Sequence, residues 1–110
     1  MISNTENNIL VLNIGLDQIN NPKSISSSSL GKDAVNYDVI LNFLVLGNIN
    51  ENQKILGSIY DSFKKENYST VLVALPEQYA DLPESWVLVP TIEEAFDFIE
   101  FERIQRDLGF

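Results

Sequence analysis

The sequence predicts a single-layer α/β fold, in which helices pack on a mixed, mostly parallel sheet. Three observations favour this class. Short and nearly continuous apolar runs recur along the chain, as is typical of strands covered on both faces. Two longer segments carry apolar residues at helical spacing. Each apolar run is followed by glycine or proline, so turns separate the elements.

The chain has the size of one domain. Its 110 residues contain 45% apolar and 21% charged residues, which is typical of a globular protein. No repeat divides it, so we expect one domain over 1–110. We expect the polar residues 1–8 to be frayed, and 17–36 to be irregular around the serine tract 26–29, with a short helical piece near 30–37.

Four segments are predicted to be strands: 9–14, 39–46, 70–75 and 86–89. The second is the longest, and Asn42 is its only polar residue. A run of this kind favours a central strand that is covered on both faces, as in parallel sheets.

The first convincing helix begins near Asn50. That residue can cap the helix, and Gln53 stands three positions on, as in a capping box. Gly57 falls inside the helix, where we expect a close packing contact. The predicted buried face consists of Ile55, Leu56, Ile59, Tyr60 and Phe63.

The final helix has the clearest start signal in the chain. Thr91 and Glu94 form a T-x-x-E capping box, and Gly109 follows the predicted end near Leu108. We expect Arg103 and Arg106 to pair with acidic residues of the same helix. The predicted buried stripe is Ile92, Ala95, Phe96 and Ile99.

A second apolar stripe follows the first and is displaced around the helix axis. Its members are Phe98, Phe101, Ile104 and Leu108. A helix that buries both stripes needs a neighbour on each side. Either the tail folds back on its own sheet, or this stripe is a homodimer contact or a site where a partner docks.

Composition excludes several classes of function. The chain has no cysteine and no histidine, which removes disulfides, thiolate chemistry and the commonest general base and metal ligand. Seven basic and sixteen acidic residues give a net charge of -9, which disfavours nucleic acid and anionic membranes as partners. No signal sequence or membrane span is predicted, so we expect a soluble cytoplasmic protein.

The remaining chemistry would depend on carboxylates. Asp17 and Glu77 follow predicted strands, but no second acid adjoins Asp17, and no glycine-rich phosphate loop is present. We therefore expect no catalytic residues, no metal site and no cofactor.

Segments 39–60, 70–76 and 89–96 together resemble the STAS domains of bacterial anti-sigma factor antagonists. In that family a buried strand leads through a short loop into a helix, and a T-x-x-E-A helix ends the domain; here that motif begins at Thr91. The tail 102–110 is similar to the ending of small STAS-like bacterial proteins often encoded beside ribonuclease Z. The resemblance implies a STAS-like fold.

The family also implies a partner site at the start of the first long helix. Its aspartate falls on Asn50, and the phosphorylatable serine that follows has no counterpart, because Glu51 and Asn52 carry no hydroxyl. We expect partner binding by Asn50, Glu51, Asn52 and Lys54, together with the second stripe of the final helix.

The leading hypothesis is a non-enzymatic regulatory protein-interaction module that lacks the switch serine. Its partner would be an anti-sigma factor, a protein like the switch kinases, or a neighbouring-gene product such as ribonuclease Z. Two alternatives stay open. One is a small acidic hydrolase or phosphotransfer protein that uses Asp17, Glu51 or Glu77, and the other is a structural subunit that forms a dimer.

Overall fold

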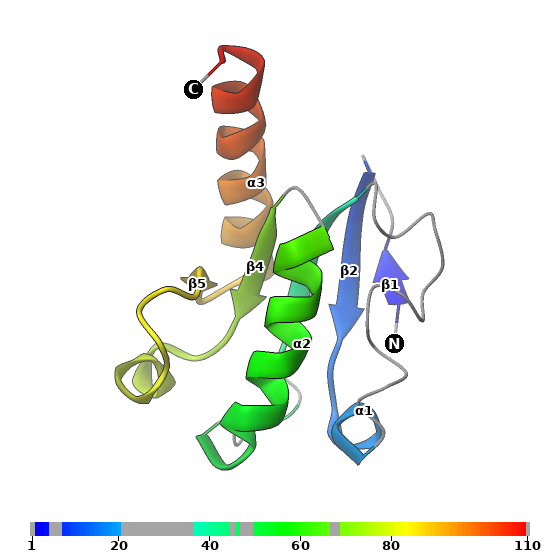
Figure 1. Cartoon of the computed structure of the whole chain (residues 1–110), viewed down its shortest axis with the longest axis vertical. Helices are drawn as coiled ribbons and strands as arrows, with labels where there is room; N and C mark the ends of the chain where they lie inside the picture. The colour runs from blue at the N-terminus through cyan, green and yellow to red at the C-terminus, as the bar shows by residue number, and fades with distance from the viewer. Residues whose placement is uncertain are drawn as a thin grey trace.

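A five-stranded mixed sheet forms the centre of the molecule (Figure 1). The computed structural model describes residues 2–4, 8–20, 37–44, 46, 50–66 and 69–109. The strands lie side by side in chain order: β1 (Ile2–Asn4), β2 (Ile9–Asn13), β3 (Asp38–Asn42), β4 (Thr70–Val73) and β5 (Leu88–Val89). β1 is antiparallel to β2, and β2 to β5 are parallel. The predicted α/β class with a mixed, mostly parallel sheet is confirmed.

The strands are shorter than the apolar runs that predicted them. β3 pairs with β2 from Asp38 opposite Ile9 to Asn42 opposite Asn13, and then ends. The side-chain oxygen of Asn42 accepts the backbone N–H of Leu44 at 3.1 Å, which turns the chain out of the sheet. The polar residue inside the apolar run therefore marks the end of the strand.

Helices connect or follow the strands. A short helix α1 (Leu16–Asn20) follows β2, and a 3-10 turn η4 (Asn50–Asn52) leads into α2 (Gln53–Glu66). A second 3-10 turn η5 (Pro76–Asp81) joins β4 to β5, and α3 (Ile92–Asp107) ends the described chain. Helix α2 thus begins three residues after the predicted cap Asn50.

One face of the sheet packs against α2. Alternate strand residues, such as Leu41 and Leu72, point to this face and contact the buried stripe of α2. The stripe is as predicted, with Ile55 only partly buried. Its fully or nearly fully buried members are Leu56, Ile59, Tyr60 and Phe63.

The opposite face packs against α3. The other set of strand residues, such as Ile40 and Val73, contacts Ala95 and Ile99 of α3, which are both fully buried. Because α2 and α3 cover opposite faces, the molecule has three layers, and the predicted single layer is wrong. The direction in which the chain leaves β5 decides the face that α3 covers, and periodicity alone does not encode that direction.

The amino terminus also differs from expectation. Residues Ile2–Asn4 pair with β2 as an edge strand instead of being frayed. Within the segment predicted to be irregular, α1 buries Ile19 against the α2 face. The rest of that segment, 21–36, with the serine tract and most of the predicted helical piece, lies outside the described residues.

None of the helices in the described ranges combines the length and the hydropathy that a membrane crossing requires.

Candidate functional site

The residues predicted to bind a partner fall into two separate places. The first, which we call the helix-start surface, comprises Glu51, Asn52 and Lys54 at the junction of η4 and α2. Glu51 and Lys54 are exposed and Asn52 is half-buried. Asn50 belongs to the same turn, η4. The helix-start surface follows the carboxyl end of β3.

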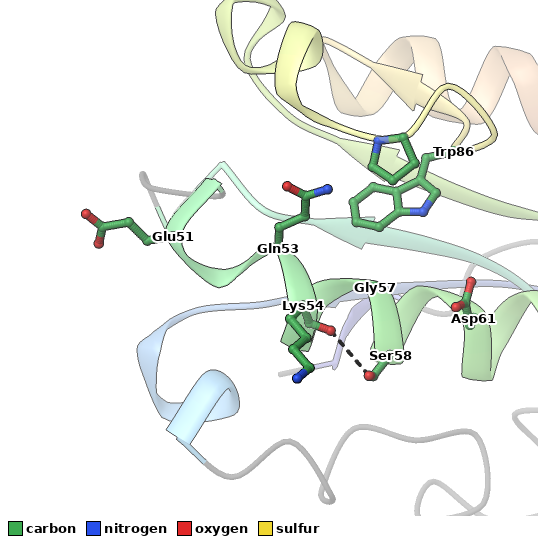
Figure 2. Close-up of a pocket in the computed structure, with 8 residues that line it drawn as sticks. Glu51, Gln53, Lys54, Gly57, Ser58, Asp61 and Trp86 are labelled. Carbon is green, nitrogen blue, oxygen red and sulfur yellow. Dashed lines mark hydrogen bonds between the residues drawn. The ribbon is translucent and has the colours of Figure 1, made fainter.

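A groove of about 610 Å³ lies beside this surface, between α2 and the segment that leads into β5. In Figure 2, Lys54, Ser58 and Asp61 project from successive turns of α2, while Glu51 points away from Trp86. The hydroxyl of Ser58 donates to the backbone carbonyl of Lys54 at 3.3 Å. The groove therefore offers mainly polar groups of both charges along one wall.

The other wall of the groove is held by tight packing around Trp86. A Cβ atom placed on Gly57 would lie 3.2 Å from Cζ2 of Trp86, so glycine allows the indole to approach the helix backbone. The Tyr60 and Trp86 rings lie 5.5 Å apart between centroids. The Tyr60 hydroxyl also accepts the backbone N–H of Val87 at 3.3 Å. The packing contact expected at Gly57 is confirmed.

The second place is the carboxyl-terminal half of α3. Thr91 caps this helix: its hydroxyl accepts the backbone N–H of Glu94 at 3.1 Å, which confirms the predicted cap. Farther along, Arg103 and Arg106 reach the carboxylate of Asp38, which is 2% exposed at the start of β3. The distances are 2.6 Å from Arg103 Nε and 3.2 Å from Arg106 Nη2, both to Oδ2.

This ion-pair cluster fixes the orientation of α3. Arg103 also donates to the backbone carbonyl of Asn8 at 3.2 Å, so the helix is tied to β3 and to the residue directly before β2. The sequence predicted that both arginines pair with acids of their own helix, whereas the structure joins them to a carboxylate on β3. The buried Asp38 is satisfied by charge-assisted hydrogen bonds, as a buried charge must be.

Three large apolar side chains lie on the opposite side of α3. We call Phe101, Ile104 and Leu108 the tail stripe; they are 58%, 57% and 66% exposed. Their spacing of three and four residues places them in one row, roughly 160° around the helix axis from the two arginines. Phe98, predicted to belong to this row, is instead half-buried against the α3 side of the sheet. The alternative in which the sheet of the same chain covers the whole second stripe is therefore wrong for Phe101, Ile104 and Leu108.

The helix-start surface and the tail stripe do not form one site. Helix α2 starts beyond the carboxyl end of β3, whereas the tail of α3 is anchored to Asp38 at the amino end of the same strand. Figure 1 shows the start of α2 at the lower end of the molecule and the red tail of α3 at the upper end. A small partner domain would contact one of these surfaces and not the other.

The candidate catalytic acids are also dispersed. Asp17, Glu51 and Glu77 are exposed on α1, η4 and η5 respectively. Among the described residues, no group of three or more acidic side chains could hold a metal ion.

Tyr79, in the 3-10 turn η5, has an altered pKa. Burial and, to a smaller extent, the charge of Glu94 raise the pKa of Tyr79. Its hydroxyl donates to the backbone carbonyl of Ala74 at 3.1 Å. This hydrogen bond holds η5 against the residue that follows β4.

The sequence did not predict the role of Asp38 as the partner of both arginines, or the packing of Trp86 on α2. The available signal for Asp38 was an acidic residue directly before a buried apolar run, since a charge at such a place needs a partner. The signal for the Trp86 contact was Gly57 inside an amphipathic helix, although the sequence did not identify Trp86 as the residue that packs on this glycine.

Comparison of the chain with family models, curated proteins and solved structures finds no match.

Proposed function

We propose that this chain is a cytoplasmic, non-enzymatic regulatory protein that binds another protein through the tail stripe. The observation that carries the proposal is a row of three apolar side chains, each more than half exposed, on a helix whose orientation is fixed by an ion-pair cluster. Apolar side chains grouped in this way mark interaction sites. Covering them with a partner removes apolar surface from water, which favours association.

The resemblance to anti-sigma factor antagonists supports the regulatory part of the proposal. The parallel unit β3–α2–β4 and the Thr91-capped final helix are compatible with the order of elements in STAS domains. The partner would then be an anti-sigma factor, a protein like the switch kinases, or ribonuclease Z. Because Asn52 has no hydroxyl, we expect regulation without phosphorylation at the switch position. The single charge of Glu51 is a poor copy of phosphate, which carries nearly two charges at neutral pH.

The helix-start surface is a second candidate for partner binding. Glu51 and Lys54 are exposed beside a groove whose far wall is a rigidly packed tryptophan. Charged side chains next to a fixed aromatic residue suit recognition of a polar segment. It would serve a contact separate from that of the tail stripe.

The two remaining alternatives have weaker support. A hydrolase or phosphotransfer protein needs convergent groups, whereas Asp17, Glu51 and Glu77 are exposed on three different elements. A dimer-forming structural subunit would use the same tail stripe, so the oligomeric state in solution separates it from the proposal.

Affinity capture with purified variants tests the proposed function. The bait proteins are the wild type, Phe101→Asp, and the matched control Leu75→Asp, because Leu75 is an exposed leucine (42%) between β4 and η5. We expect a protein from the source cells that the wild type and the control both bind, and that Phe101→Asp binds about tenfold more weakly in a binary assay. Equal capture by all three baits, or no enriched protein, would contradict the proposal.

A further inference from the structure

We infer that the occupant of the tail stripe is a basic amphipathic helix of the partner protein, and not a second copy of this chain. The inference rests on the proposed function, since it names the chemistry of the partner at the same surface. It depends on three properties of α3: the spacing of the stripe, the position of the arginines, and the sign of the charges that flank the stripe.

The spacing of the stripe suits a helix. Phe101, Ile104 and Leu108 are separated by three and four residues, the alternation found along the seam between two packed helices. The row extends over about two helical turns, or about 10 Å. A partner helix laid along α3 could place apolar residues of the same period between these three side chains.

The anchoring of α3 turns its cations away from the stripe. Arg103 and Arg106 are the basic residues of the described helix, and both reach Asp38 at the side that faces the sheet. On one side of the stripe and beyond it the exposed residues are acidic, and on the other side the exposed neighbour is the uncharged Gln105. Glu100 and Asp107 flank it directly, and Glu93, Glu94 and Asp97 continue the acidic surface toward the start of the helix.

This pattern opposes pairing with a second copy. In an antiparallel pair of α3 helices centred on Ile104, Glu100 of one copy would lie beside Asp107 of the other, by the helical period. Like charges placed together at flanking positions destabilise a helix pair. The net charge of -9 on each chain adds long-range repulsion. Lysine or arginine flanking the seam of a partner helix would convert the same contacts into attraction.

Two synthetic helical peptides provide the probes. Both carry leucine at the seam positions; one has lysine and the other glutamate at the flanking positions. Fluorescence anisotropy with the full chain measures binding. We expect the lysine peptide to bind at least about tenfold more tightly than the glutamate peptide, and its affinity to fall between about 50 and about 300 mM salt.

Variants locate the binding on α3. Phe101→Asp should lower the affinity for the lysine peptide about tenfold. Circular dichroism should show an unchanged fold, because Phe101 is largely exposed. The double variant Glu100→Lys and Asp107→Lys should bind the lysine peptide more weakly and the glutamate peptide more tightly than the wild type does. The matched control is Glu77→Lys with Glu84→Lys, which changes the net charge equally at exposed positions on another segment. It should leave binding of the lysine peptide within about twofold of the wild type.

Each contrary outcome overturns the inference. Similar affinities for the two peptides, or no binding of either, would exclude recognition of a basic helix. An equal loss of affinity for the lysine peptide in the Glu77→Lys, Glu84→Lys control would show that the attraction is not local to α3. A dimer in sedimentation velocity that Phe101→Asp dissociates would assign the stripe to a second copy. The proposed function fails separately, in the capture experiment: it is contradicted if the wild type, Phe101→Asp and the Leu75→Asp control capture the same proteins, or if no protein is enriched.

Discussion

The two long helices of this molecule use their apolar residues differently. In α2 the large apolar side chains, such as Leu56 and Phe63, lie on the face that packs on the sheet, and the other face is polar. In α3 the sheet is met by Ala95 and Ile99, while Phe101, Ile104 and Leu108 point outward. The demands of folding explain the apolar residues of α2. The same demands leave the tail stripe of α3 unexplained, and this is why we assign it to association.

The largest expected effect compares one phenylalanine from each helix. Phe63→Ala should lower the free energy of unfolding by about 3–5 kcal/mol, because Phe63 is fully buried against the sheet. Phe101→Ala should change it by about 0.5 kcal/mol or less, since most of that ring is already in water. Urea denaturation of both variants measures the difference. A comparable loss at Phe101 would mean that the tail stripe belongs to the core.

A second prediction removes the anchor of α3. Asp38→Asn should lower the free energy of unfolding by about 2–3 kcal/mol; the value is reduced from that of a fully buried pair because both arginines are about one-third exposed. Hydrogen exchange should speed up in the second half of α3 and not in α2. Asp107→Asn, at an exposed position on α3, is the control and should have little effect. An equal increase of the hydrogen-exchange rates in α2 and α3 would argue against a local anchor.

A third prediction concerns the fit of α2 against Trp86. Gly57→Leu should cost about 1–3 kcal/mol, because its side chain must displace the indole that lies 3.2 Å from the Cβ position. Trp86 is the single tryptophan of the chain, so its fluorescence emission should shift as it becomes more exposed. Ser58→Leu, one residue along at an exposed position, serves as the control and should leave the emission unchanged. An unshifted emission in Gly57→Leu would contradict the contact.

The smallest expected effect tests the start of α3. Thr91→Ala should cost about 1 kcal/mol in thermal or urea unfolding, because the backbone N–H of Glu94 loses its side-chain acceptor. Thr91→Ser retains the hydroxyl and should recover most of the stability. If the serine and alanine variants are equally destabilised, the methyl group of Thr91 contributes more to stability than its hydroxyl does.

The sequence was sufficient where short-range rules decide the structure. The buried face of α2 follows from helical spacing, and the cap at Thr91 follows from one hydroxyl and its neighbour three residues on. It was insufficient where distant segments meet. The pair Arg103 and Asp38 joins residues 65 positions apart, and this contact decides which side of the tail faces the sheet. Phe98 was therefore assigned to the wrong stripe, and the separation of the two candidate surfaces was not foreseen.

The edges of the sheet restrict how any partner can attach. β5 has two residues and is followed directly by Pro90, which has no N–H to donate; β1 has three, with an irregular register between Ile2 and Asn4. An incoming strand needs a longer ladder of free backbone groups than the described residues of either edge offer. Short edges of this kind disfavour edge-to-edge aggregation. The partner contact that we propose would therefore be made by side chains on helices, and not by backbone amides at a sheet edge.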